Sequence, residues 1–342
     1  MERAPLEETT PPMEEPYPGC SNFIRQIYSR KNISETSIEI IVGSFSQNTL
    51  KQYNSTFSKW WSFCTGNTNI IFQADAHNIL NFLTQEFEKG ATITTINTHK
   101  SALNLLSEAG KSVEVERFIK GVFKARPSFP RYEEIWDPYP VLEMLEKLHP
   151  LESLDLTNLS VKLVLLLALG TAQRVQTLAK IKLSNILSSE DGLKIMITDI
   201  LKTSAPKRPQ PVLIFPFFKE KPELCIATTI LHYIKRTKLF RKSENSLILT
   251  VKKPQHPATT QTISRWIKYG LGKNGVDINK FKGHSTRHAS SSAAFKTGLN
   301  IEIIRNSAGW TEKSSSFARF YNRPVSAKET PFACYIETLT KS

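Results

Sequence analysis

The chain has 342 residues, a formal net charge of +14, and 40% hydrophobic and 22% charged residues. This length can bury a sizeable core in one large domain or two smaller ones. The longest wholly apolar run, Leu163–Leu169, is too short to span a bilayer, and the first residues show no signal-peptide pattern. The four scattered cysteines form no Cys-x-x-Cys pair, which argues against a disulfide or zinc framework and favours a reducing intracellular compartment.

The positive charge is unevenly distributed along the chain. Residues 1–20 contain five Glu and one Arg and sum to −4, so the remainder sums to +18. A basic body of this size attracts polyanions, and nucleic acid is the leading candidate partner. A basic surface without a dedicated partner explains the charge equally well. We interpret residues 1–39 as an acidic, Pro-rich disordered tail and lead-in.

Residues 40–124 predict an all-helical domain. Apolar residues recur at three- and four-residue steps in four stretches, which predicts helices over 44–64, 75–89, 92–109 and 113–124. The polar faces of these helices carry candidate DNA-contacting residues, namely Lys51, Lys59, Asn97 and Lys100, beside His99. For any one of them, a solvated helix face is the commoner explanation.

A linker and a second domain follow. Residues 125–140 contain four prolines and no periodicity, so we place the domain boundary there. A short helix is expected over 141–148 and a buried one over 159–169. Gly170 is predicted to end the buried helix and Thr171 to cap the next, which puts Arg174 in its first turn. That is a rigid mount for a catalytic group, although a structural salt bridge is the usual role of a single Arg.

The second domain also carries the clearest β signal. Strands are predicted over 182–186, 194–201 and 211–215, forming a small antiparallel sheet. The turn-rich segment 202–210 then presents Lys202, Lys207 and Arg208, and a solvated loop explains the last two equally well. Further helices are expected over 222–239, 261–269, 286–297, 301–307 and 314–321. Arg265 and Lys268 share one helix face and are additional DNA-contact candidates.

Five side chains suit chemistry on a phosphodiester. Arg174 and Arg287 offer planar, permanently charged forks that match non-bridging phosphate oxygens. His284, in an H-x-x-R spacing with Arg287, can accept or donate a proton. Trp310 can supply one N–H donor and bulk. Tyr321 is the candidate nucleophile, because guanidinium and imidazole groups nearby would lower its phenol pKa from about 10.

Two other kinds of site are less favoured. Ser285 and Ser290–Ser292 crowd a histidine and could supply a serine nucleophile, but the G-x-S-x-G elbow of hydrolases is missing. The sequence has no H-E-x-x-H motif, no paired cysteines and no dense Asp/Glu cluster that would suggest a metal nuclease. We therefore expect no metal and no cofactor.

Four segments together carry a resemblance to a known family. They are TAQRVQTL around Arg174, LKTS around Lys202, HSTRHASSS around His284 and Arg287, and AGW with FARFYNRP around Trp310 and Tyr321. On these segments the chain resembles the tyrosine recombinase (phage-integrase-like) family, particularly the enzymes of DIRS-type retrotransposons and related mobile elements. The likeness extends from about Ile40 to Pro324.

The resemblance implies a fold and an assembly. It implies a mainly α fold with a small antiparallel β-sheet, in which residues 40–124 form a SAM-like core-binding domain and residues 141–324 the catalytic domain. The two would close as a clamp on double-stranded DNA, and protomers would assemble through dimers into a homo-tetramer. Residues 325–342 form a tail whose Phe332, Ile336 and Leu339 share one helix face. That face would dock on a neighbouring subunit or cap its own domain. A nuclear location follows from the substrate and the resemblance.

The resemblance also implies residue roles. Tyr321 would attack the phosphate and hold the DNA as a 3′-phosphotyrosyl ester, while Arg174 and Arg287 clamp the non-bridging oxygens. His284 would help move the tyrosine proton, and Lys202 would be the general acid for the departing 5′-oxygen. Trp310 stands where many members have a second His. One departure is Thr177, at a position three residues after the first Arg where many members carry an acidic residue.

The sequence therefore predicts a site-specific DNA recombinase or integrase of a mobile element, working without nucleotide or metal. Two alternatives stay open at this point. One is a catalytically silent DNA-binding protein derived from a mobile element, and the other is a type IB topoisomerase-like relaxase that shares the site chemistry.

Overall fold

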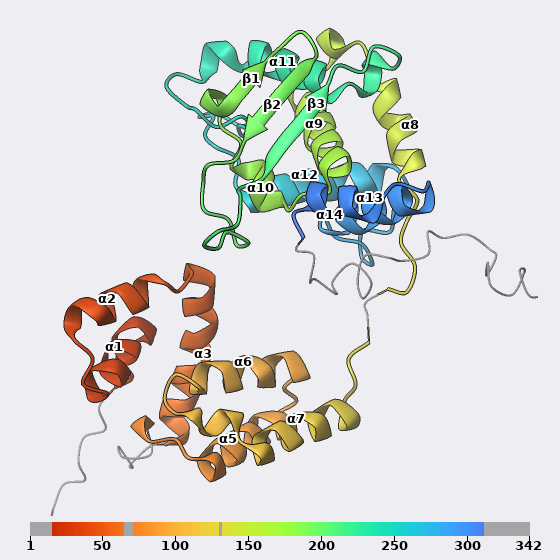
Figure 1. Ribbon diagram of the computed structural model, residues 1–342. Helices are drawn as coiled ribbons and strands as arrows, with labels where there is room; N and C mark the ends of the chain where they lie inside the picture. Colours follow the sequence, from red (N-terminus) through yellow and green to blue (C-terminus); the bar gives the residue numbers. More distant parts are fainter. Residues whose placement is uncertain (1–15, 65–70, 130–131, 311–342) are drawn as a thin grey trace, which may run out of the picture. The chain divides into compact units, whose positions relative to one another are not determined.

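The computed structural model describes residues 16–64, 71–129 and 132–310, and the chain divides into two compact units, residues 1–130 and 131–342 (Figure 1). The expected helix over 314–321, with Tyr321, and the tail over 325–342 lie outside the described residues. Within the described ranges, no helix combines the length and the apolar character that crossing a membrane requires.

The N-terminal unit is built from helices. They are α1 (Cys20–Arg30), α2 (Glu35–Gly43), α3 (Gln47–Phe63), α5 (Ala76–Glu88), α6 (Ile93–Leu103) and α7 (Val113–Ala125). Most begin at a Ser, Thr or Asp whose side chain accepts a bond from a backbone N–H three residues on, as Ser46 and Asp75 do. Phe23, Phe57 and Phe82 lie in its core, where edge-to-face ring pairs fix their packing.

This unit differs from expectation at two places. The helical domain was expected from residue 40, but α1 and α2 precede that point and contribute Phe23, Ile24 and Ile38 to the same core. The helix expected over 92–109 ends at Leu103, and a 3-10 turn follows at Glu108–Lys111. After Leu103 the regular pattern is lost: the N–H groups of Leu105 and Leu106 bond three residues back, and the Ser107 hydroxyl donates to the carbonyl of Ala74.

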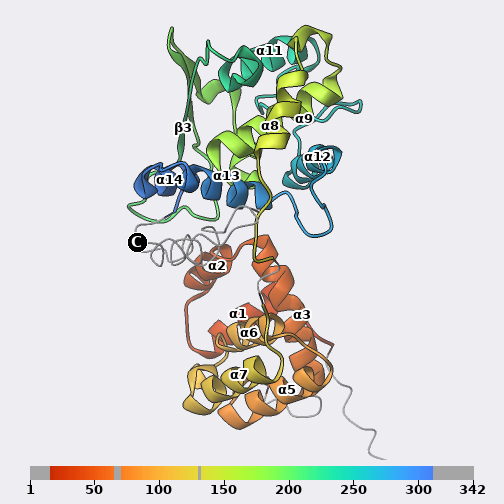
Figure 2. The ribbon, with the colours of Figure 1, turned by 90° about the vertical axis from the view of Figure 1, so that its right-hand side faces the viewer.

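The C-terminal unit is organised around α9 (Leu156–Thr171), which is buried along most of its length. Helices α11 (Ile226–Thr237), α12 (Thr260–Lys273) and α13 (Ser285–Lys296) pack against it (Figures 1 and 2). A helix that is apolar almost all round must be enclosed in this way. Its one buried cation, Lys162, donates to the carbonyls of Leu145 and Leu148 at the end of α8 (Tyr139–Lys147), at 2.9 and 2.6 Å.

A three-stranded antiparallel sheet completes this unit. Strands β1 (Ile186–Ser188), β2 (Gly192–Met196) and β3 (Val212–Pro216) lie in the order β1-β2-β3. Ile195 stands opposite Ile186 on one side and Leu213 on the other, and the alternation buries one face. The first strand starts at Ile186, later than expected, because residues 183–185 form a 3-10 turn. The predicted fold class, mainly helical with a small antiparallel sheet, is confirmed.

The turn after α9 also differs from expectation. Gly170 does not end the helix, which runs to Thr171, and Ala172 then adopts the left-handed conformation (φ 49°, ψ 23°). Thr171 satisfies the helix end through its hydroxyl, which donates to the Leu167 carbonyl at 2.6 Å and accepts from the Gln173 N–H at 3.1 Å. Arg174 is therefore itself the N-cap of α10 (Val175–Ala179), not a residue of its first turn.

Candidate active site

Arg287 is the buried centre of the candidate site. It lies in the first turn of α13 with 1% of its surface exposed. Its guanidinium donates to the carbonyl of Ala172 at 2.6 Å and to that of Ala308, the last residue of α14 (Ile301–Ala308), at 3.1 Å. Hydrogen bonds from a charged donor are strong, and two of them fix the plane of the fork. Arg287 therefore joins the α9–α10 turn to the end of α14.

His284 stands at the N-cap of the same helix, three residues before Arg287. Its side chain is exposed, yet the surrounding protein and then the charges of Arg287 and Arg174 lower its pKa to about 4. The action of both guanidinium charges on one imidazole indicates that the three side chains share a neighbourhood. The imidazole is neutral at pH 7 and can accept a proton.

Two successive side-chain hydrogen bonds through Gln173 hold the α9–α10 turn that leads to Arg174. The hydroxyl of Thr177 donates to Oε1 of Gln173 at 3.2 Å, and Nε2 of Gln173 donates to the carbonyl of Ser307 at 2.5 Å. Both side chains are buried. At the position where the family pattern has an acid, Thr177 thus supports the turn through an amide and not through a charge.

Trp310 closes the site from the end of α14. Gly309 ends that helix in the left-handed conformation (φ 66°), which a residue with a side chain adopts only at a cost. The turn brings the Trp310 ring within 5.1 Å of the guanidinium carbon of Arg287, a cation–π distance. Ala172, Ile304 and Ala308 pack with Trp310 in a small apolar cluster.

Lys202 lies in the long β2–β3 connection, which runs from the sheet past α10 in Figure 1. Its side chain is exposed, and its backbone N–H donates to Oε1 of Gln176 on α10 at 3.2 Å. Arg208 donates to the carbonyl of Gly309 at 2.7 Å, beside an open groove of about 690 Å³ that Trp310 also lines. The connection that carries Lys202 is therefore tied to both α10 and the end of α14.

The structure thus brings together four of the predicted residues, Arg174, His284, Arg287 and Trp310, and ties the backbone of Lys202 to the helix that begins at Arg174. The alternative serine nucleophile gains no support from these contacts. Ser285 is buried and accepts a bond from Trp136 at 2.9 Å, and Ser291 donates to the Arg287 carbonyl at 2.6 Å. In the described part of the chain, no group of three His, Cys, Asp or Glu side chains could hold a metal.

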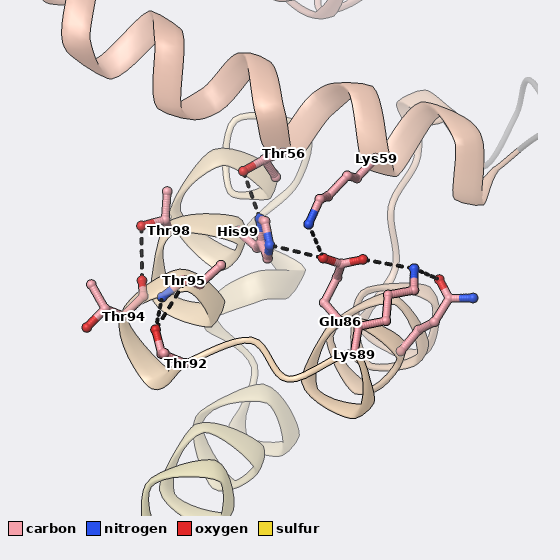
Figure 3. Close-up of polar contacts among 10 residues, drawn as sticks. Thr56, Lys59, Glu86, Lys89, Thr92, Thr94, Thr95, Thr98 and His99 are labelled. Carbon is pink, nitrogen blue, oxygen red and sulfur yellow. Dashed lines mark hydrogen bonds and ion pairs between the residues drawn. The ribbon is translucent and has the colours of Figure 1, made fainter. Parts of the chain in front are cut away.

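The candidate DNA contacts of the N-terminal unit include paired side chains. Nζ of Lys59 lies 2.5 Å from the Glu86 carboxylate, which is 2% exposed and also binds Lys89 at 3.0 Å (Figure 3). Nε2 of His99 lies 3.6 Å from the same carboxylate, and Nδ1 shares a 2.8 Å hydrogen bond with Thr56. Lys59 is thus part of a cluster that joins α3, α5 and α6.

Among the remaining candidate DNA contacts, two side chains have partners within the protein and four are exposed or half-buried. Lys100 pairs with Glu116, and the Asn97 amide donates to the Ile93 carbonyl at 3.0 Å. Lys51, Lys207 and Arg265 are exposed, and Lys268 is half-buried. These four residues stay predicted DNA contacts.

Sequence reasoning missed Gln173, Gln176 and Trp136, which support the site. None belongs to a residue type that signals catalysis. Trp136 did carry one signal, since a tryptophan in a Pro-rich linker is out of keeping with a solvated segment.

Comparisons with known proteins relate this site to a protein family. Residues 141–326 match the sequence model described as the phage integrase family, a stretch that includes every predicted catalytic residue from Arg174 to Tyr321. No curated protein sequence is similar enough to the chain to count as a match.

Three solved structures have the same fold at low sequence identity. The XerH site-specific recombinase bound to its difH substrate is 11% identical, with a TM-score of 0.56 over 94% of this chain and 89% of that one. The lambda integrase dimer bound to a core site is 17% identical, with a TM-score of 0.53 over 90% and 97%. The Tn1549 transposon integrase with transposon right-end DNA is 14% identical, with a TM-score of 0.57 over 94% and 98%. Because the family model covers more than half of the sequence and the fold agrees, the chain belongs to the phage integrase family and has the tyrosine recombinase fold.

Proposed function

We propose that this protein is a site-specific DNA strand-exchange enzyme of a mobile element, which cuts and rejoins DNA through a 3′-phosphotyrosyl intermediate. The observation that carries the proposal is the arrangement around Arg287. Its guanidinium bonds to the turn that leads to Arg174 and lies beside the Trp310 ring, and both arginine charges act on His284. The family match supports it further, because it continues through Tyr321.

In the forward step, the phenol oxygen of Tyr321 bonds to the scissile phosphorus and the bond from phosphorus to the 5′-oxygen breaks. Neutral His284 takes the phenol proton, and Lys202 gives a proton to the departing 5′-oxygen. Arg174 and Arg287 stabilise the charge that grows on the non-bridging oxygens. In the reverse step, a 5′-hydroxyl of a partner strand attacks the ester, and Tyr321 recovers its proton. The bond energy stays in the ester, so rejoining needs no nucleotide.

The proposal includes a biological setting. The transposon integrase among the structural relatives supports a mobile-element role, and the four sequence segments favour a DIRS-type element acting in the nucleus. Lambda integrase has been solved as a dimer on a core site and as a tetramer on a Holliday junction. We extend this assembly to the present chain, with dimers on double-stranded DNA pairing into tetramers.

The test is formation of a covalent adduct by the full chain. The protein is incubated with nicked suicide duplexes taken from the DNA that flanks its reading frame, and with a pool of randomised nicked duplexes. We expect an adduct that survives SDS and releases a 5′-hydroxyl end. Tyr321→Phe should bind the same duplexes and form no adduct.

Other outcomes identify the rival functions. Binding without any adduct, in the wild-type protein, would mean a silent DNA-binding protein. Relaxation of supercoiled plasmid with no dependence on the flanking sequence would mean a topoisomerase-like relaxase. An adduct in Tyr321→Phe would mean that another residue is the nucleophile.

A further inference from the structure

The segment 132–136 enters the C-terminal unit without a helix or an extended strand, yet Ile135 and Trp136 are buried and Tyr132 is partly buried. The sequence places it in the Pro-rich linker, where solvated residues are usual. In the structure, Ile135 is fully buried and Trp136 is 6% exposed. Tyr132 packs beside the same core. Two buried large side chains and one partly buried one indicate that this segment is part of the C-terminal unit's architecture.

Two of these side chains contact the start of α13. The indole N–H of Trp136 donates to the Ser285 hydroxyl at 2.9 Å, and both groups are buried. The ring of Tyr132 lies edge-on to the ring of His288, with centroids 5.5 Å apart. Tyr132 also packs on Phe281, at 4.9 Å between centroids. The segment therefore holds α13 at its first residue, one turn later, and in the loop before it.

These contacts lead directly to His284. Ser285 is its neighbour in the chain, and the ring of His288 lies edge-on to the ring of His284 at 5.6 Å. His284 is also the N-cap of α13, a position where Ser, Thr, Asp or Asn usually fixes the first turn with its own side chain. A histidine caps less well, so the place of this turn depends more on tertiary contacts.

We propose that Tyr132 and Trp136 are positioning residues, which clamp the first turn of α13 and so hold the His284 imidazole in its reactive orientation. The proposal rests on the proposed function, because it concerns the proton transfer assigned to His284. The clamp supports His284 and not Arg287, because the Arg287 guanidinium is fixed independently by the Ala172 and Ala308 carbonyls. Loss of the clamp should therefore affect the imidazole first.

Misplacement of a catalytic group by about 1 Å can cost about a hundredfold in rate. We therefore expect Trp136→Phe, which keeps one aromatic ring but removes the N–H donor and part of the bulk, to slow single-turnover adduct formation about 10- to 100-fold. Ser285→Ala should have a similar effect. Because both remove one shared bond, the double variant should be no slower than the worse single variant.

The decisive readout is dependence on His284. In a His284→Ala background, Trp136→Phe should cause no further loss of rate, whereas a general destabilisation of the fold would slow that background too. Trp266→Phe, a partly buried tryptophan of α12 in the same unit, is the matched control and should leave the rate unchanged. Additive losses, an unchanged rate in Trp136→Phe, or a further loss in the His284→Ala background would overturn the proposal.

A second measurement is independent of catalysis. The titration of His284 is followed by NMR of its ring protons in the wild-type chain and in Trp136→Phe. Since desolvation by the surrounding protein and two nearby cations hold its pKa at about 4, a released ring should titrate closer to the ordinary value of about 6.5. If the wild-type protein forms no adduct, the proposed function fails, and the titration alone decides the clamp. An unchanged titration would then reject it.

Discussion

Arg287 has a structural task that the contacts show, beside the chemical task that we propose for it. Its guanidinium is 1% exposed and bonds to the Ala172 and Ala308 carbonyls, so it ties together the ends of two helices. Ala172 holds a left-handed conformation that is costly for a residue with a side chain. A bond to its carbonyl helps to maintain that strained turn. Arg287 and the backbone turn to which it bonds therefore depend on each other.

Replacement of this arginine by lysine should expose the dependence. Arg287→Lys keeps the charge, but a single ammonium cannot reproduce the fork that bonds two carbonyls. We expect the opening free energy of α13 to fall by about 2–4 kcal/mol and the adduct to be lost. Native-state hydrogen exchange measures the first effect. Arg265→Lys, an exposed arginine on α12, should change it by less than about 0.5 kcal/mol. Equal effects of the two substitutions would contradict the structural role.

The role that we propose for Lys202, proton donation to the 5′-oxygen, can be tested with a substrate whose leaving group needs no proton. Lys202→Ala should slow cleavage of ordinary DNA about 10²- to 10⁴-fold. The same variant should cleave a substrate with a 5′-bridging sulfur at close to the wild-type rate, since a thiolate leaves without a proton. Lys207→Asn, at a predicted DNA contact in the same loop, is the comparison: it should weaken binding of both substrates alike and leave the ratio of their cleavage rates unchanged. Asparagine tolerates the left-handed backbone at this position (φ 64°). Equal slowing of both substrates by Lys202→Ala would assign the acid elsewhere.

Among the elements, the Glu86 cluster shows how a buried carboxylate can engage lysines whose side chains remain exposed. One buried carboxylate binds Lys59 and Lys89 and approaches His99, so three helices meet on a single charge. Burial raises the pKa of Glu86, but the bonds from the two lysines outweigh it and the pKa lies below its ordinary value. Burial lowers the pKa of His99, which keeps it neutral at pH 7.

Glu86→Gln should therefore weaken the N-terminal unit in a pH-dependent way. A carboxyl with a depressed pKa contributes stability above its unfolded pKa, about 4.5, and loses it as the pH falls through the folded value. We expect the variant to lower the opening free energy of α5 by about 1–3 kcal/mol at pH 7. The difference from wild type should shrink in acid. Hydrogen exchange at pH 7 and in acid measures the opening free energy of α5. Glu116→Gln, at a half-exposed carboxylate, is the control and should change the opening free energy of its own helix, α7, by less than about 1 kcal/mol. A difference that is constant with pH would contradict the account.

The elements also show what local patterns can predict. The helices expected over 44–64, 75–89 and 113–124 correspond closely to α3, α5 and α7, because each has a periodic apolar face and a capping residue. Helix α1 was missed because it follows a Pro- and Glu-rich stretch and starts at Gly19 without a side-chain cap. The end of α9 was misplaced because the Thr171 hydroxyl serves the finished helix and not the next one.

For the molecule as a whole, the sequence predicted the fold class and named four residues that the structure brings together, but not the side chains that support them. Arg174, His284, Arg287 and Trp310 could be named because their types suit phosphate chemistry. Their supports, such as the bond from Trp136 to Ser285 across 149 positions of sequence, have no local pattern. Likewise, charge alone could not show that Lys59, which is exposed like Lys51, pairs with the buried carboxylate of Glu86. Long-range pairing is decided by packing, which a linear pattern does not contain.

The central claim is that this molecule joins its own Tyr321 to DNA, and peptide mapping of the adduct tests it most directly. Trypsin does not cleave before proline, so Tyr321 lies in the peptide FYNRPVSAK, where it is the sole tyrosine. After nuclease trimming, mass spectrometry of the wild-type adduct should find this peptide carrying a nucleotide through the tyrosine oxygen. A nucleotide on any other residue, or an adduct whose peptide lacks Tyr321, would contradict the account.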